Sequence, residues 1–72
     1  MTITQLKYVL AVAEHKNFTL AAEKCFVTQP TLSMQIQKIE EELNIQIFDR
    51  TKKPIQLTDI GQKIVTQAKN IV

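Results

Sequence analysis

The amino-acid sequence predicts a small, mainly α-helical domain with one short β-hairpin near its C-terminal end. Apolar residues recur at helical spacing in four separate segments, which indicates amphipathic helices around a shared core. Between the third and fourth segments, residues 45–50 and 55–57 alternate apolar and polar side chains and are rich in β-branched residues, as short strands are. The 72 residues suffice for one domain with a modest core, and 44% of them are hydrophobic, which excludes a disordered chain.

Composition narrows the classes of function that the chain can serve. Cys25 is the only cysteine and His15 the only histidine, so neither an internal disulfide nor a Cys/His zinc site can form. Gly61 is the only glycine, which excludes a glycine-rich phosphate-binding loop. We find no catalytic constellation, and we expect neither an enzyme nor a cofactor. No apolar run approaches the roughly 18 residues of a membrane span and no secretory leader is present, so we expect a cytoplasmic protein without a membrane partner.

The first apolar set predicts a helix over residues 4–15. Its members follow spacings of three, three, one and three residues, which place them on one face of a helix. They are Ile3, Leu6, Val9, Leu10 and Ala13. Thr2 or Thr4 can cap this helix. Lys16 and Asn17 are expected to form the turn to the next helix.

The second predicted helix is short and has Thr19 as its N-cap, with Phe18 placed to pack against the entering chain. The apolar residues that follow are Leu20, Ala21, Ala22, Cys25 and Phe26. The small side chains of Ala21 and Ala22 let another helix cross closely, as a helix-turn-helix requires. Cys25 is expected to be a small buried apolar side chain and not a redox sensor.

The third predicted helix follows Val27 and ends at Asn44, which readily adopts the left-handed conformation of a helix end. Thr28 is the expected N-cap, and Pro30 falls in the first turn, where its missing N–H is not needed. Four apolar residues fall within about 60° of one another on a helical wheel and are expected in the core. They are Leu32, Ile36, Ile39 and Leu43.

The remaining residues predict a hairpin and a final helix. Strand-like residues 45–50 and 55–57 are joined by a four-residue connection whose tip, Lys52 and Lys53, is basic. The final helix is predicted to begin at Thr58, which can cap it. Its apolar stripe consists of Ile60, Ile64, Ala68 and Ile71.

The order helix, helix, helix, hairpin, helix is that of a winged helix-turn-helix. Residues at fixed spacing along this order resemble the N-terminal DNA-binding domain of LysR-type transcriptional regulators, over essentially the whole chain and without an insertion. They are Ala21-Ala22, Thr28 to Ser33, Gln35-Ile36, Ile39-Glu40, Leu43, Phe48, Arg50, and Leu57-Thr58 with Gly61. A narrower set resembles the peroxide-sensing, OxyR-like branch of these regulators. Its members are Ala13 to His15, Cys25 two residues before Val27, and Gln29 to Ser33.

The resemblance implies a division of the chain into two parts. Residues 1–57 would form the winged helix-turn-helix, and residues 58–72 would begin a linker or dimerisation helix that leads to an effector-binding domain. The stripe of this helix, Ile60, Ile64, Ala68 and Ile71, would then pack against its twin in a homodimer. An alternative is that the stripe belongs to the core of the protomer. Such a dimer would read inverted-repeat half-sites about 34 Å apart or a multiple of that distance, and a full-length protein would form a higher oligomer.

The third predicted helix, residues 28–43, is the expected recognition helix. The major groove admits one helix, and the N-terminal part of that helix contacts the base edges. Gln29 can donate and accept hydrogen bonds together, which suits adenine, and Pro30 offers apolar surface to a thymine methyl group. The expected base contacts are Gln29, Pro30, Thr31, Ser33 and Met34. The expected contacts of the DNA backbone and of the wing, residues 50–55 at the minor groove, are Thr19, Thr28, Gln35, Lys38, Arg50, Lys52 and Lys53.

Charge and polarity leave one alternative function open. The formal net charge of +2 permits a nucleic-acid partner without requiring one. A winged helix that serves as a protein–protein interaction module, without DNA specificity, would carry an apolar outer face on the third helix. That face is polar apart from Met34, which favours double-stranded DNA. In the acidic run 40–42, Glu40 lies near the core edge and can pair with a basic residue, and Glu41 is expected to turn away from the DNA.

Overall fold

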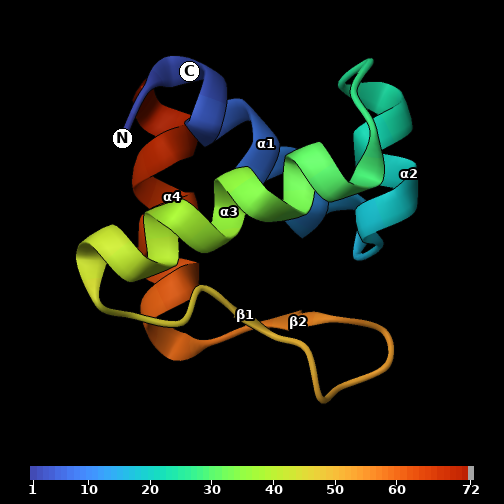
Figure 1. The fold of residues 1–72 in the computed structure, drawn as a ribbon. Coiled ribbons are helices and arrows are strands. Elements are labelled where there is room, and N and C mark those ends of the chain that lie inside the picture. The colour runs from blue at the N-terminus through green and yellow to red at the C-terminus, as the bar shows by residue number, and fades with distance from the viewer. Residues whose placement is uncertain (72) are drawn as a thin grey trace.

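The computed structural model describes residues 1–71, with side chains described through Asn70. Within this range the elements follow the predicted order of a winged helix-turn-helix (Figure 1). They are α1 (Ile3–His15), α2 (Phe18–Lys24), α3 (Gln29–Leu43), β1 (Phe48–Asp49), β2 (Gln56–Leu57) and α4 (Asp59–Ile71). The prediction of a mainly α fold with a two-stranded antiparallel hairpin is therefore confirmed. No helix in the described part is long and apolar enough to cross a membrane.

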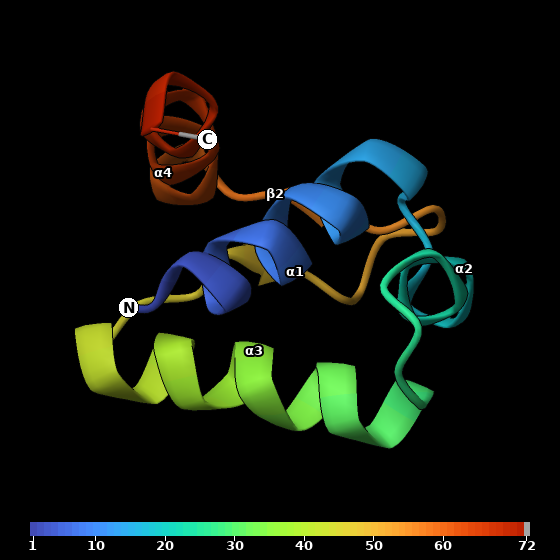
Figure 2. The same cartoon turned by 90° about the horizontal axis from the view of Figure 1, so that it is seen from above.

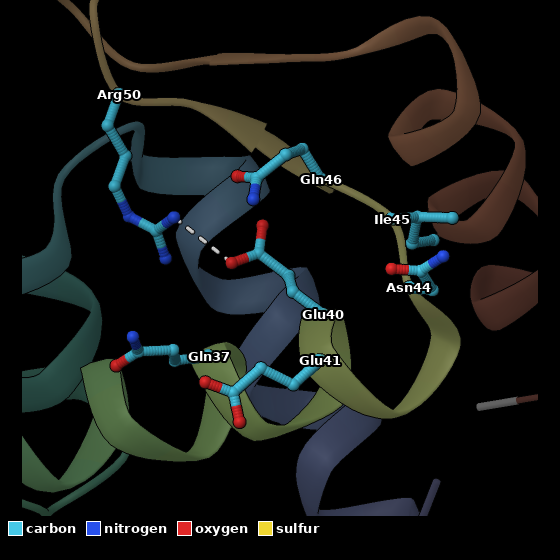
Figure 3. A pocket seen from close by; sticks show the side chains of 7 residues that line it. All are labelled: Gln37, Glu40, Glu41, Asn44, Ile45, Gln46 and Arg50. Carbon is cyan, nitrogen blue, oxygen red and sulfur yellow. Dashed lines mark hydrogen bonds and ion pairs between the residues drawn. The ribbon is translucent and has the colours of Figure 1, made fainter.

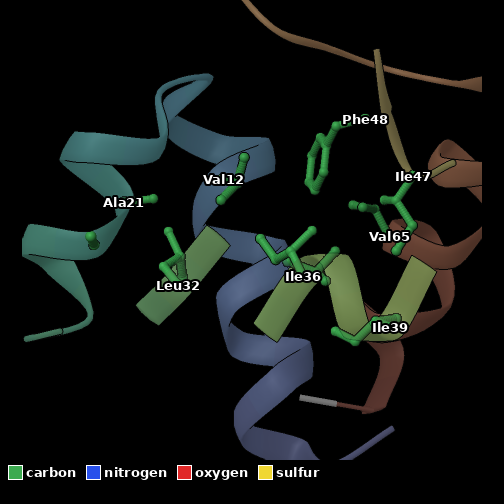
Figure 4. Close-up of a cluster of buried hydrophobic side chains, with 10 residues drawn as sticks. Val12, Ala21, Leu32, Ile36, Ile39, Ile47, Phe48 and Val65 are labelled. Atoms are coloured by element: carbon green, nitrogen blue, oxygen red, sulfur yellow. The ribbon is translucent and has the colours of Figure 1, made fainter. Parts of the chain in front are cut away.

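Helix α1 lies at the centre of the fold. It contacts α2, α3 and α4, and Figure 2 shows α3 and α4 on opposite sides of it. The core between these helices consists of aliphatic side chains and one aromatic ring (Figure 4). Its buried members are Val9, Val12, Ala21, Ala22, Leu32, Ile36, Ile39, Ile47, Phe48 and Val65. Because α3 packs only its inner face on this core, its outer face remains available to a partner.

The N-cap of α1 is one of the two predicted residues, whereas the N-cap of α2 is not the predicted one. Thr2 and not Thr4 caps α1, in a capping box in which the Gln5 N–H donates to Thr2 Oγ1 (3.1 Å) and the Thr2 N–H to Gln5 Oε1 (2.9 Å). The prediction that Thr19 caps α2 is wrong. Asn17 Oδ1 accepts the Leu20 N–H (2.9 Å), so the helix begins two residues earlier than predicted.

Helix α2 also ends earlier than predicted, so that Cys25 and Phe26 lie in the turn to α3. Phe26 adopts a left-handed backbone conformation with φ 60° and is exposed, whereas it was expected among the apolar residues of the helix. Cys25 is half-buried and not fully buried, and desolvation by this burial raises the pKa of its thiol. Val27, which follows Phe26, packs against the core again.

The start of α3 is as predicted. Thr28 Oγ1 accepts the Thr31 N–H (3.4 Å), and Pro30 lies in the first turn. Leu32, Ile36 and Ile39 are buried, but the prediction that Leu43 is also buried is wrong, because 46% of it is exposed. Leu43 lies on the last turn of α3, which extends past the end of α1 in Figure 2 before the chain reverses. The reversal occurs at Asn44, which is left-handed as predicted (φ 54°).

The hairpin is shorter than predicted. Phe48 pairs with Leu57 and Asp49 with Gln56, so the connection spans the six residues 50–55. Ile47, which was predicted within the strand, precedes it and is fully buried. The longer connection carries Lys52 and Lys53 and is the wing of the fold.

The junction from the hairpin to α4 is closely packed. Thr58 caps α4 as predicted, since its Oγ1 accepts the Gly61 N–H (3.0 Å), and the Thr58 N–H donates to the Ile47 carbonyl (3.0 Å). A Cβ atom on Gly61 would collide with that carbonyl oxygen. Only glycine allows this approach of α4 to the segment before β1.

The apolar stripe of α4 is divided between the core and the surface. Ala68 is only 1% exposed and packs within the protomer, so its predicted role in a dimer contact is wrong and the alternative of a protomer core holds for this residue. Ile64 is half-buried and Ile60 is exposed, so both remain open to a partner. The side chain of Ile71 lies outside the described residues.

Candidate nucleic-acid interface

The outer face of α3 brings most of the predicted base-reading residues together. Ser33 and Met34 follow Pro30 by three and four residues and therefore lie on the same side of the helix as Pro30. Gln29 lies one turn before Ser33 and is half-buried at the edge of this side. These four residues occupy the first two turns of α3, which is the part of a recognition helix that enters a major groove.

Thr31 lies beside this group and is linked to the helix cap. Thr28 Oγ1 donates to Thr31 Oγ1 (2.8 Å) and also accepts the Thr31 N–H. Because one hydroxyl proton is used between Thr28 and Thr31, the pair keeps one hydroxyl proton that can be donated to a phosphate.

Two further predicted backbone contacts differ in availability. Gln35 is half-buried, and its Oε1 accepts a hydrogen bond from Gln5 Nε2 (3.1 Å). This bond ties α3 to α1 and leaves only the amide N–H groups of Gln35 for another partner. Lys38 on α3 and Thr19 on α2 are exposed, as a phosphate contact requires.

Glu40 is a buried carboxylate that joins α3 to the start of the hairpin (Figure 3). It is 3% exposed, and its Oε2 accepts the N–H groups of Ile47 (2.8 Å) and Phe48 (3.3 Å). Its Oε1 accepts a hydrogen bond from Arg50 Nη1 (3.0 Å). The prediction that Glu40 pairs with a basic residue is confirmed. The two backbone bonds were not predicted, because no sequence pattern signals a carboxylate that receives strand N–H groups.

Arg50 was predicted to contact phosphate, and in the structure its side chain contacts Glu40 and Phe18 of the same chain. Its guanidinium pairs with Glu40 and lies 5.1 Å from the centre of the Phe18 ring, which itself packs edge to face on Phe48 (6.0 Å, 73°). The Arg50 side chain is still 39% exposed. It can therefore face a phosphate while its position is fixed by Glu40.

The wing presents Lys52 and Lys53 at its exposed tip. At its base, Asp49 Oδ1 accepts the Thr51 hydroxyl and the Thr51 N–H (3.0 Å). These two hydrogen bonds, with a smaller effect from Lys52, hold the pKa of Asp49 below its usual value. The wing thus keeps a fixed turn geometry at its base and two cations at its tip.

Glu41 is exposed on the outer face of α3, beyond the residues expected to read bases. Glu41 follows Gln37 by four residues and Met34 by seven, so helical periodicity places all three on the outer face, and Glu41 and Gln37 line the same shallow pocket (Figure 3). Its Cα lies about 16 Å along the helix axis from that of Pro30. The negative charge therefore confines the surface suited to DNA to the N-terminal half of α3.

The part of the chain that the structure describes offers no metal centre. No group of three or more His, Cys, Asp or Glu side chains within residues 1–71 is arranged to hold an ion. The candidate site is an exposed surface of polar groups on α3 and cations on the wing.

Comparisons with known proteins identify relatives of this fold and surface. The description of bacterial regulatory helix-turn-helix proteins of the lysR family matches residues 3–62. The DNA-binding transcriptional dual regulator OxyR of Escherichia coli strain K12 is 43% identical over 72 residues, which are 100% of this chain and 24% of that protein. This chain thus spans about a quarter of the length of that curated relative.

Solved structures of DNA-binding regulators have the same fold. The crystal structure of the BenM DNA-binding domain in complex with benA site 1 DNA superposes with a TM-score of 0.96 at 41% identity, over 99% of this chain and 80% of that one. Full-length OxyR from Pseudomonas aeruginosa superposes with a TM-score of 0.92 at 45% identity, over 99% of this chain and 24% of that one.

Proposed function

The chain belongs to the lysR family of bacterial regulatory helix-turn-helix proteins, and from this premise we propose that it binds operator DNA sequence-specifically, with the first two turns of α3 in the major groove. The observation that supports this most is the outer face of α3. Pro30 is exposed there, with the half-buried Gln29 and Ser33 beside it, at the helix end farthest from the acidic residues 40–42. The wing tip would meet the adjacent backbone or minor groove through Lys52 and Lys53.

Selection and titration test this proposal. A duplex would be selected from a random-sequence pool by binding to this domain, and its affinity measured by fluorescence anisotropy at several salt concentrations. We expect a selected sequence that binds at least a thousandfold more tightly than a scrambled duplex, and a steep salt dependence. Enrichment of no sequence, together with a flat salt response, would refute the proposal and favour a protein–protein module.

We also propose that α4 begins a linker that pairs two protomers, with the DNA-binding part in residues 1–57 and the linker from residue 58. The exposed Ile60 and half-buried Ile64 support this, because they form an apolar strip that the protomer leaves partly open. A dimer built in this way would read inverted-repeat half-sites. Footprinting on the selected duplex would show two protected half-sites about one helical turn, or a multiple, apart.

A response to peroxide is the finer proposal, and the similarity to OxyR supports it. The sensing group would lie outside this domain. Burial raises the pKa of the Cys25 thiol, and a thiol held in its protonated form reacts slowly with an oxidant.

Hydrogen peroxide treatment distinguishes a sensing group outside this domain from sensing by Cys25 within it. The regulator that contains this domain should change its operator footprint, whereas the isolated domain should keep its DNA affinity. If the treated domain lost affinity and Cys25→Ser prevented the loss, the assignment of sensing to another part would be wrong.

A further inference from the structure

The turn between α2 and α3 holds a phenylalanine where the backbone favours glycine. The Phe26 N–H donates to the Glu23 carbonyl (3.2 Å) and the Val27 N–H to the Ala22 carbonyl (3.0 Å). These two bonds define the Schellman motif that ends a helix. In this motif Phe26 has a positive φ of 60°. A positive φ brings the side chain close to the backbone, which is least favourable for a bulky side chain. The sequence therefore accepts an unfavourable residue at this position.

Packing does not account for this phenylalanine. Phe26 is 95% exposed, far more than the other large apolar side chains that the structure describes. Lys16 and Asn44 take the same conformation at the ends of α1 and α3, and both have polar side chains suited to an exposed position. Neither the local backbone nor the core therefore explains the ring, and a partner outside the chain would.

The position of the turn indicates which partner. Phe26 precedes the N-cap Thr28 by two residues, so its Cα lies at most about 11 Å from that of Gln29. In Figure 1 the turn lies above the N-terminal end of α3, and the wing lies below α3. A helix in the major groove has a sugar–phosphate backbone on each side, because the groove is only about 12 Å wide. The wing and the turn are placed to meet these two backbones.

The geometry points to Phe26 as a contact of double-stranded DNA, with its ring against a deoxyribose at the groove edge opposite the wing. This inference rests on the proposed function. The contact would be apolar, since a phenyl ring carries no charge and the neighbouring exposed Glu23 and Lys24 offset each other. It would strengthen binding to any sequence equally, because a deoxyribose carries no base information.

A tryptophan reporter tests the contact directly. The chain contains no tryptophan, so Phe26→Trp introduces a single indole at this position. Saturating this variant with the selected duplex should quench and shift the indole emission. Leu43→Trp is the matched control, because Leu43 is also exposed and lies at the opposite end of α3, where the emission should not change. An unchanged emission from Phe26→Trp, at saturation confirmed by anisotropy, would overturn the inference.

A glycine variant tests its energetic part. Phe26→Gly should leave the Tm unchanged or raised, because glycine suits the turn, yet weaken binding of selected and scrambled duplexes by about fivefold. The loss should be the same at each salt concentration, unlike that of a lysine variant. Equal affinity of Phe26→Gly and the parent chain would overturn this inference alone. A parent chain that binds no duplex would overturn both this inference and the proposed function.

Discussion

Glu40 gives the sharpest quantitative prediction, because one carboxylate holds three donors. Glu40→Gln keeps an amide oxygen for the Ile47 N–H but removes the charge that Arg50 pairs with and leaves the remaining acceptor position with an amide NH2. A hydrogen bond to a charged group contributes about 1.5–3 kcal/mol. Because Arg50 is 39% exposed, its part is reduced by solvent screening. We therefore expect the free energy of unfolding to fall by about 2 kcal/mol.

The assay is urea and thermal unfolding followed by helical circular dichroism. A domain of this size loses about 4–8 °C in Tm for each kcal/mol, so Glu40→Gln should lower the Tm by more than 8 °C. Glu41→Gln is the matched control, as it makes the same chemical change on the adjacent, exposed residue, and its effect should stay within about 0.5 kcal/mol. Equal Tm values for the two variants would refute the assignment of Glu40 as the joint between α3 and the hairpin.

Four further outcomes follow from the same geometry. Gln29→Ala should weaken binding to the selected duplex by about 1–3 kcal/mol in an anisotropy titration and leave binding to a scrambled duplex unchanged. Equal losses of affinity for both duplexes would exclude base reading by this residue. Lys52→Ala should weaken both duplexes and reduce the log–log salt slope by about 0.9, whereas an unaltered slope would remove Lys52 from the phosphate contacts. Gly61→Ala should destabilise the fold by about 3 kcal/mol in urea, because its Cβ meets the Ile47 carbonyl; the usual helix-stabilising effect of alanine would contradict that contact. Ile60→Asp should shift sedimentation equilibrium toward monomer without lowering the Tm of a dilute sample, and undiminished association would place the dimer contact elsewhere.

The elements were predictable where a local signal agreed with the packing. Thr28, Pro30 and Asn44 bound α3 because capping and left-handed turns depend on residues close in sequence. The burial of Ile36 and Ile39 followed from helical periodicity. Periodicity failed at Leu43, because a stripe does not show where the covering helix ends.

What the sequence did not reveal had several other causes. The roles of Glu40 and Arg50 depend on a contact across ten residues, between a helix and a hairpin that no local pattern brings together. Asn17 and not Thr19 caps α2 because two residues, two positions apart, were both suitable, and the packing of Phe18 on Phe48 favours the earlier start. The exposure of Phe26 could have been suspected only from the turn bonds, which the sequence does not show.

The backbone groups of Ile47 connect α3 to α4. The N–H of Ile47 is held by Glu40 of α3, and its carbonyl is held by Thr58 and pressed by Gly61 at the start of α4. Helices α3 and α4 are thus connected through the two sides of a single residue, Ile47. In the dimer proposed above, this joint would make the separation of the two α3 helices on DNA depend on how the two α4 helices cross.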